Sequence, residues 1–233
     1  MKTKDEVKDF YDQYTVNQVK NEKNLRHYTI TSYLKKMGLK KSHNVLEIGC
    51  GIGALSELIF KQIPQGSFVG VDISPKSIAI ANERFKAYNN VEFIVSDMTD
   101  FSHDKKFDYI VLPDVLEHIP EDEHKNIIET IGKISTDKTV VFINIPSPEH
   151  NDYLEKHEPD KLQVIDLQLS MGRMISHFEN SGFRLDIFEK YSIFRKEKDY
   201  IKMVFSRKRE VDFSDMRPLW KRIPEKFFKR ISL

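Results

Sequence analysis

The sequence predicts an α/β fold built on a doubly wound, seven-stranded, mostly parallel sheet with helices on both faces. Short apolar runs alternate with helix-like stretches along most of the chain, a rhythm typical of consecutive strand–helix–strand units. The sixth and seventh runs are joined by residues 192–199, which is too short for a helical crossover, so the last strand is expected to be antiparallel. A turn with three glycines follows the first run and exposes backbone to a ligand.

The expected elements follow one another along the chain. Helix is expected over most of the first 40 residues, with Gly38 as its stop. Strands are expected at 44–48, 67–71, 91–95, 107–112, 139–143, 184–191 and 200–206. Helices are expected at 54–62, 75–88, 121–134 and 165–181. Ser74 and Pro75 form an N-cap and first-turn pair. Residues 146–164, which hold three prolines, are expected to form a loop at the carboxyl end of the fifth strand, where such sheets bind ligands.

The composition favours one domain in a reducing compartment. The chain has 233 residues, of which 39% are hydrophobic, enough for one substantial core. Its formal net charge of +1 gives no overall field that would select nucleic acid as a partner. Cys50 is the single cysteine, so no intrachain disulfide can form. Without a signal-peptide core or an apolar run of about 20 residues, the protein is expected to be cytoplasmic.

The glycine turn and the acid after the second strand together predict a nucleoside site. Residues 45–53 read VLEIGCGIG, an apolar strand that leads into alternating glycines and then a helix. This arrangement exposes backbone N–H groups to a ligand. Asp72 stands at the end of the next strand, where its carboxylate can accept hydrogen bonds from a ribose diol.

The same turn also fits a dinucleotide fingerprint, so two nucleosides must be weighed. Gly49-x-Gly51-x-x-Ala54 satisfies G-x-G-x-x-G/A. Glu47, however, lies beside the turn, where a carboxylate would repel a pyrophosphate. A further acid, Asp97, follows the third strand. Acids after three successive strands suit an adenosine that carries a sulfonium and an ammonium group. An NAD(P)-dependent oxidoreductase remains the alternative.

Four motifs carry a resemblance to a known family. They are Glu47-x-Gly49-Cys50-Gly51-x-Gly53, Gly70-Val71-Asp72-Ile73-Ser74, Ser96-Asp97, and Asp108-Tyr109-Ile110-Val111 leading into Leu116-Glu117-His118-Ile119. In these motifs the chain resembles class I S-adenosylmethionine-dependent methyltransferases, among them enzymes that act on sugars and small metabolites. The resemblance implies a Rossmann-like fold in three parts: an N-terminal helical lid at 1–40, a cofactor-binding domain at 41–207 with an acceptor loop at 146–164, and a tail at 208–233.

The resemblance also implies a site for S-adenosyl-L-methionine. Its methionine side would be lined by Glu47, Gly49, Cys50, Gly51 and Gly53. Asp72 would take both ribose hydroxyls, and Ile73 would pack on the adenine. Asp97 would accept from the adenine amine, with Met98 beside the ring. Cys50 reads as a small residue that fits the turn.

Two further groups are implied near the reacting sulfur. Pro113 and Asp114, at the end of the fourth strand, would lie beside the sulfonium. In this family an aromatic residue or an arginine from the N-terminal segment often closes over the cofactor. Tyr11, Tyr14 and Arg26 are the candidates, and Arg26 could pair with the cofactor carboxylate.

Methyl transfer to a hydroxyl needs a base, and histidine is the usual one because its pKa lies near working pH. His150 and His157 lie in the expected acceptor loop and are the first candidates. His118, in the Leu116-Glu117-His118-Ile119 motif, either fixes the turn near the cofactor or lines the active site. No cluster of metal-ligand residues stands out in the sequence, so no metal is expected.

The tail carries the expectation about the acceptor. Residues 213–233 read FSDMRPLWKRIPEKFFKRISL, a basic and aromatic segment with apolar residues at every fourth position. Such a segment either lies on an anionic membrane surface or packs on its own domain or on a second subunit of a homodimer. A membrane-seeking tail favours O-methylation of a sugar or a surface-polysaccharide precursor. N-methylation of an amino sugar or small amine is the alternative, and a non-catalytic protein that keeps the fold is a third.

Overall fold

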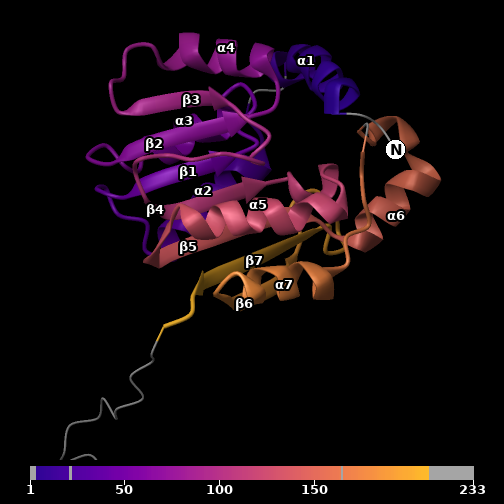
Figure 1. Ribbon diagram of the computed structural model, residues 1–233. Coiled ribbons are helices and arrows are strands. Elements are labelled where there is room, and N and C mark those ends of the chain that lie inside the picture. The colour runs from indigo at the N-terminus through magenta and orange to yellow at the C-terminus, as the bar shows by residue number, and fades with distance from the viewer. Residues whose placement is uncertain (1–3, 21–22, 164, 210–233) are drawn as a thin grey trace, which may run out of the picture.

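The computed structural model describes residues 4–20, 23–163 and 165–209, which form one sheet with helices on both faces (Figure 1). The strands are β1 Asn44–Ile48, β2 Ser67–Asp72, β3 Val91–Val95, β4 Phe107–Pro113, β5 Ser135–Pro146, β6 Phe183–Tyr191 and β7 Tyr200–Arg207. The helices are α1 Lys4–Lys20, α2 Leu25–Lys36, α3 Ala54–Phe60, α4 Pro75–Phe85, α5 Glu121–Lys133, α6 Pro148–His157 and α7 Met171–Asn180. Two short 3-10 helices, η1 Leu116–His118 and η2 Pro159–Lys161, complete the set.

The sheet has the order β3-β2-β1-β4-β5-β7-β6, which confirms the predicted doubly wound architecture. The ladders from β3 to β5 are parallel, and β7 runs antiparallel to both β5 and β6. The short connection between β6 and β7 therefore has the geometry that its length required. The strand order reverses between β1 and β4. The chain continues from β1 to β2 on one side and from β4 to β5 on the other, so the loops that follow β1 and β4 diverge and leave a crevice between them.

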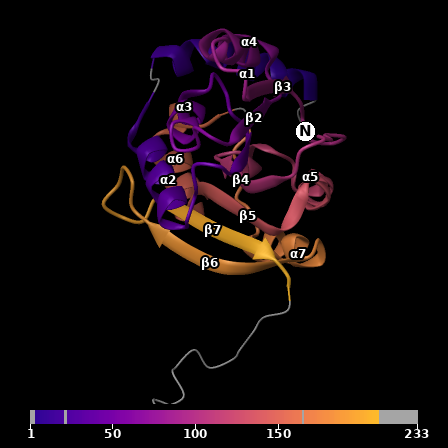
Figure 2. The ribbon, with the colours of Figure 1, turned by 90° about the vertical axis from the view of Figure 1, so that its left-hand side faces the viewer.

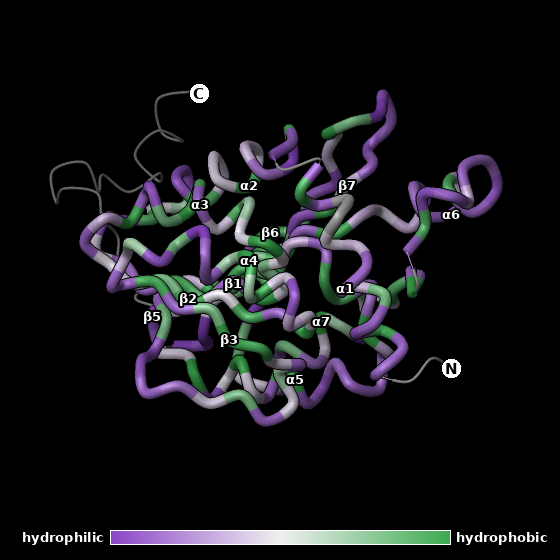
Figure 3. Tube along the Cα trace, turned by 90° about the horizontal axis from the view of Figure 1, so that it is seen from above, coloured by the Kyte–Doolittle hydropathy of each residue, from purple (hydrophilic) through white to green (hydrophobic). Residues whose placement is uncertain are grey.

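Each face of the sheet carries its own core. Because successive strand residues point to opposite faces, Val45 joins the core formed with α2, α3 and α4, while Leu46 joins the core formed with α5 and α7. Figure 2 shows these helices on the two sides of the strands. Figure 3 shows hydrophobic strands at the centre of the molecule and a mostly hydrophilic α6 at its periphery.

The N-terminal segment is helical as predicted but forms two helices. α2 starts at an Asn24 cap, whose side chain accepts from the His27 backbone N–H. The backbone N–H of Asn24 in turn faces the His27 ring, which closes a capping box. The predicted stop is present, since Gly38 adopts a positive φ of 92° two residues after α2 ends.

Two element predictions were wrong. Residues 146–164 are not simply a loop, because α6 begins there with Ser147 as N-cap and Pro148 in the first turn, the same pairing as Ser74 and Pro75. The helix expected at 165–181 begins only at Met171, after a Ser170 cap. Residues 165–170 have no regular secondary structure, and the backbone N–H of Leu167 donates to the Glu117 carbonyl at 2.8 Å, which holds this segment against η1.

The tail at 210–233 lies outside the described residues, and so do the predictions made for it. Within the described ranges, no helix combines the length and the apolar character needed to span a membrane.

Candidate cofactor and acceptor site

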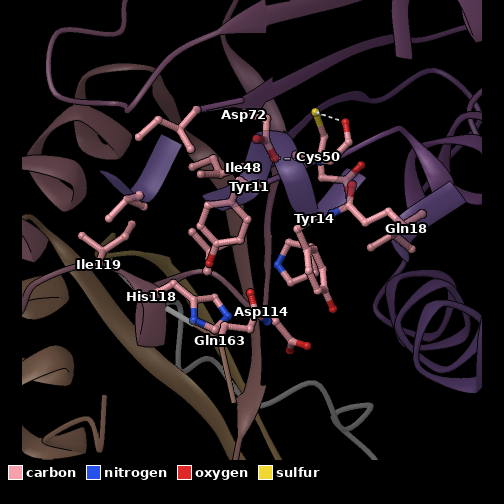
Figure 4. A pocket seen from close by; sticks show the side chains of 18 of the residues that line it. Tyr11, Tyr14, Gln18, Ile48, Cys50, Asp72, Asp114, His118, Ile119 and Gln163 are labelled. Carbon is pink, nitrogen blue, oxygen red and sulfur yellow. Dashed lines mark hydrogen bonds between the residues drawn. The ribbon is translucent and has the colours of Figure 1, made fainter. Parts of the chain in front are cut away.

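A cavity of about 320 Å³ opens at the carboxyl ends of β1, β2 and β4, where the sheet order reverses. Twelve of the predicted site residues line it: Tyr14, Arg26, Glu47, Gly49, Cys50, Gly51, Asp72, Ile73, Asp97, Met98, Pro113 and His118. Tyr11 and Asp114 also line it, and Figure 4 shows the Tyr11 ring in the middle of the space. Residues more than 100 positions apart in the chain thus meet at one edge of the sheet.

The turn after β1 has the conformation that its glycines allow. Gly49, Gly51 and Gly53 have φ values of 76°, 52° and 81°, in the left-handed region that side chains disfavour. A Cβ at Gly49 would lie 2.4 Å from Val115 Cγ2, and one at Gly51 would lie 2.9 Å from Gln18 Nε2. The N–H groups of Gly49 and Cys50 both donate to the Val71 carbonyl, which ties the turn to β2.

Gly53 lies at the inner side of this turn. A Cβ there would lie 3.0 Å from Phe85 Cε2, so the glycine allows close packing of α3 on α4. It is not among the residues that line the cavity, and its part in cofactor binding stays a prediction.

Two buried carboxyl groups flank the turn. The Glu47 side chain is 1% exposed and accepts a hydrogen bond from Ser56 Oγ at 2.6 Å; burial raises its pKa to about 8. Asp72 accepts from the backbone N–H of Gly51 at 2.8 Å and of Ser74 at 2.9 Å. Burial raises the pKa of Asp72, and these two hydrogen bonds act in the opposite direction. Asp72 therefore fixes the glycine turn in addition to facing the cavity.

The predicted adenine end is formed after β2 and β3. Ile73 and Asp97 line the cavity there, and Asp97 Oδ1 accepts from the Thr99 backbone N–H at 2.9 Å. Met98 is 2% exposed and has a positive φ of 66°. This combination of an apolar floor and a carboxylate edge suits a purine ring with an exocyclic amine.

One face of α1 covers the cavity. Val7, Tyr11, Tyr14 and Gln18 all line it, and their spacing of four, three and four residues places them on one side of a helix. The Tyr11 hydroxyl is buried and has no hydrogen-bond partner among the described residues. Burial, together with the nearby charges of Glu117 and Asp166, raises the pKa of Tyr11.

Asp12 fastens α1 to the rest of the domain. Its Oδ1 atom accepts from Ser74 Oγ at 2.5 Å and from the Lys76 backbone N–H at 3.2 Å. Both donors belong to the N-terminus of α4, where the helix dipole favours a negative charge. Figures 1 and 2 both show α1 beside α4.

Arg26 and Asp114 form an ion pair at the end of β4. Asp114 adopts a positive φ of 51° and is held by its neighbours: its backbone N–H donates to the Asn144 carbonyl at 2.7 Å, and its carboxylate lies 3.3 Å from Tyr200 Oη. The Arg26 Nε atom is buried, and no hydrogen-bond partner for it lies in the described part of the chain. This atom can still donate a hydrogen bond, and the pairing of Arg26 with a cofactor carboxylate stays a prediction.

His118 is fixed in one orientation. Its Nδ1 atom lies 2.6 Å from the Ile165 carbonyl and 3.3 Å from Asp166 Oδ1. Because a carbonyl oxygen only accepts, Nδ1 carries the hydrogen when the ring is neutral, and Nε2 is then the basic atom. Nε2 lies 3.8 Å from Glu117 Oε1. Burial lowers the pKa of His118, which favours the neutral ring. The Tyr11 and His118 rings meet at 6.2 Å between centroids.

The structure does not bring His150 or His157 to the cavity. Both lie on α6, the helix that replaces the predicted loop. The His150 ring is 6.3 Å from the Tyr200 ring, and its pKa is lowered by burial. His157 is exposed at the end of the helix, with its ring 4.8 Å from that of Tyr153. His118 does line the cavity, and the role of all three histidines as a base stays a prediction.

Sequence reasoning named no role for Gln18, Gln163, Ile165 or Asp166, which lie at or beside the cavity. The helical spacing of the α1 residues was a usable signal for Gln18. No local pattern indicated that residues 163–166 would contact η1, because the His118–Ile165 hydrogen bond joins residues 47 positions apart in the chain.

Within the residues that the structure describes, no group of three His, Cys, Asp or Glu side chains is placed to hold a metal ion.

The sheet order, the antiparallel β7 and the glycine turn at the switch point together define the class I methyltransferase fold, a Rossmann-like architecture. Residues 45–136 match the family model described as "Methyltransferase domain". Residues 45–136 therefore carry a methyltransferase domain, within the class I S-adenosylmethionine-dependent methyltransferase fold.

Comparison with known proteins gives relatives of several kinds. Malonyl-[acyl-carrier protein] O-methyltransferase 1 of Ilyobacter polytropus is 40% identical over 73 residues, which is 31% of this chain and 27% of that protein. Phosphoethanolamine N-methyltransferase 1 of Arabidopsis thaliana is 28% identical over 210 residues, which covers 83% of this chain and 41% of that protein. The chain thus spans less than half the length of either curated relative.

A solved structure shares the fold over nearly the whole domain. Magnesium protoporphyrin IX methyltransferase from Synechocystis, solved with bound S-adenosylhomocysteine (SAH), superposes with a TM-score of 0.70 at 18% identity, covering 88% of this chain and 100% of that one.

Proposed function

We propose that this protein transfers a methyl group from S-adenosyl-L-methionine to a small-molecule acceptor. The observation that carries the proposal is the charge of the cavity. Glu47 and Asp72 lie at the carboxyl ends of β1 and β2, and Asp97 follows β3. Arg26 is the only Lys or Arg among the described residues that line the space. Acids in this arrangement can accept hydrogen bonds from ribose and ammonium groups, and those that are ionised attract a sulfonium and repel a pyrophosphate, which argues against the NAD(P)-dependent alternative.

The residues present fit this cofactor. Asp72 lies where a ribose diol would be bound, and Glu47 with the glycine turn would face the methionine ammonium group. The unpartnered Arg26 Nε is a donor for the cofactor carboxylate. When bound, S-adenosyl-L-methionine supplies a methyl group that is activated by the positive sulfur. The protein then has to align the acceptor and exclude water.

α1 is the element we assign to exclude water, as the lid predicted for residues 1–40. Tyr11 and Tyr14 project from it over the cavity, while Asp12 holds it to the start of α4. Since Tyr11 occupies the middle of the space, entry of the cofactor requires this helix to shift. Breaking the Asp12 contact would then ease entry and weaken retention.

The two predicted acceptor classes differ in what supports them. O-methylation of a sugar or surface-polysaccharide precursor was inferred from the basic tail, most of which lies outside the described residues. N-methylation of an amino sugar or small amine is supported by the acidic surroundings of His118, and one relative that aligns with 83% of this chain carries the name of an N-methyltransferase. We therefore place the amine first.

Calorimetric titration of purified protein with S-adenosyl-L-methionine, SAH and NAD⁺ tests the cofactor. The first two are expected to bind and NAD⁺ is not. Mass spectrometry of amine and sugar mixtures incubated with protein and cofactor then tests transfer, with the gain of one methyl group as the readout. Binding of NAD⁺ in preference to both sulfur compounds would refute the proposal.

A further inference from the structure

Glu117 is a buried acid without a partner. It lies in η1, between the cavity and α6, and its side chain is 2% exposed. Neither carboxyl oxygen has a hydrogen-bond partner among the described residues. His118 Nε2 lies 3.8 Å from Glu117 Oε1, which is just beyond hydrogen-bond distance. A buried carboxyl group in this condition destabilises the fold, so its presence calls for a functional explanation.

Glu117 lines a small, mostly apolar space with residues of β5, α6 and the segment at 167–171, and the groups on its His118 side are acidic or aromatic. Asp166 lies on the other side of the His118 ring, and the Tyr11 hydroxyl nearby is also buried and unpartnered. Arg26 is the cation that lowers the pKa of Glu117, but its guanidinium is engaged by Asp114. Tyr11 and His118 therefore present ring faces to the cavity, and the acid groups of Asp166 and Glu117 lie beside the His118 ring. Once Glu117 has lost its proton, this combination suits an ammonium group.

We propose that Glu117, acting through His118, selects an amine as the methyl acceptor and takes up the proton that the amine must lose. This inference rests on the proposed methyltransferase function and names the substrate class of the same site: a primary or secondary amine that is protonated in solution. Glu117 is a positioning residue in this scheme, because His118 is the group that faces the acceptor.

The step balances without any further reactant. Because Glu117 is protonated at neutral pH, binding of the ammonium first releases the Glu117 proton to solvent. The bound ammonium then gives one N–H proton to His118 Nε2, and the ionised Glu117 stabilises the resulting imidazolium or accepts the proton from it. The nitrogen lone pair then forms the N–C bond as the C–S bond breaks, and the sulfur keeps that electron pair as a neutral thioether. The methylated nitrogen retains the positive charge.

The acidity of Glu117 is matched to an amine. Burial raises its pKa to about 8, with Asp166 acting in the same direction and Arg26 against it. That value lies within about three units of an alkylammonium group such as lysine, with pKa ≈ 10.4, so proton transfer is feasible. An aliphatic hydroxyl is far less acidic and would not give up its proton to this pair.

The test uses the full chain saturated with SAH. Ethanolamine and ethylene glycol, which differ by one amine in place of a hydroxyl, are titrated by calorimetry at pH 7 in two buffers of different ionisation enthalpy. Ethanolamine is expected to bind with release of about one proton, because either the neutral Glu117 or the ammonium must lose one. The release is expected to fall towards zero at pH 9, where Glu117 is already ionised. Ethylene glycol is not expected to bind.

Glu117→Gln is expected to weaken ethanolamine binding at least 10-fold while leaving the affinity for SAH unchanged. Glu129→Gln is the matched control, because Glu129 is an exposed acid on α5 and should alter neither ligand. Glu117→Asp is expected to restore part of the amine affinity. If Glu117→Gln does not fold, the proton release by the unmodified protein still tests the inference.

Failure to bind ethanolamine, equal binding of ethylene glycol, amine binding without proton release at pH 7, or unchanged affinity in Glu117→Gln each overturns the inference. If SAH itself does not bind, the proposed function fails first, and the two failures are thus distinguished.

Discussion

Replacing Asp72 by alanine tests the structural and the ligand-binding parts of the site together. Its carboxylate accepts hydrogen bonds from the backbone N–H groups of Gly51 and Ser74, at 2.8 and 2.9 Å. Hydrogen bonds to a charged acceptor contribute about 1.5–3 kcal/mol each. Burial of the carboxylate, which raises its pKa, offsets part of that gain. We therefore expect the free energy of unfolding to fall by about 2–4 kcal/mol, small enough to leave a typical domain folded at 25 °C.

The affinity for SAH is expected to fall further than the stability alone explains. Loss of two hydrogen bonds to a ribose diol, at about 1 kcal/mol each, corresponds to a decrease of roughly 10- to 100-fold. Urea denaturation measures the stability and calorimetric titration the affinity. Asp72→Asn keeps one acceptor oxygen and should fall between the two proteins, whereas Asp137→Ala, at an exposed position, should change neither quantity. Binding of SAH by Asp72→Ala within threefold of the unmodified protein would contradict the assignment.

Three other predictions follow from the same site. Because burial raises the pKa of Glu47 to about 8, the folded protein holds a proton there that the unfolded chain releases above about pH 4.5, and the free energy of unfolding should fall by a few kcal/mol as the pH rises from 5 to 8. Glu47→Gln should flatten this pH dependence in denaturation curves, and an unchanged pH dependence would contradict the raised pKa. Gly49→Ala should lower the melting temperature and abolish SAH binding, since its φ is 76° and its Cβ would lie 2.4 Å from Val115 Cγ2; normal binding in titration would refute the tight approach. Tyr11→Phe removes a buried, unpartnered hydroxyl, so the ligand-free protein should gain about 1 kcal/mol in denaturation, and a loss would show that the hydroxyl has a partner after all.

The fold could be predicted from the sequence because its evidence is local. Each of the seven strands is a short apolar run, and the glycines and Asp72 mark the turn that opens the site. α6 was missed even though Ser147 and Pro148 repeat the cap that was recognised at Ser74 and Pro75. The prolines in that stretch were taken as loop restraints, whereas Pro148 lies in the first turn of α6, a position that is compatible with a helix.

Contacts between distant segments could not be predicted in the same way. The irregular segment at 165–170 is held by the hydrogen bond from the Leu167 N–H to the Glu117 carbonyl, a contact that no local periodicity encodes. The pairing of Arg26 with Asp114 is of the same kind, since the sequence placed both near the cofactor but could not show that they would neutralise each other. The bases proposed from sequence, His150 and His157, depended on the course of a segment that folded differently.

The position of Cys50 provides a native reporter for the site. Its thiol is the only one in the chain, is 5% exposed beneath the glycine turn, and has a pKa that burial raises. The thiolate, and not the neutral thiol, reacts with alkylating reagents, so Cys50 should resist them while it is buried. The rate of Cys50 modification then measures how often the glycine turn opens. A compound that slows the modification is one that binds and stabilises the closed turn. No engineered label is needed, because the chain has no second cysteine that would react.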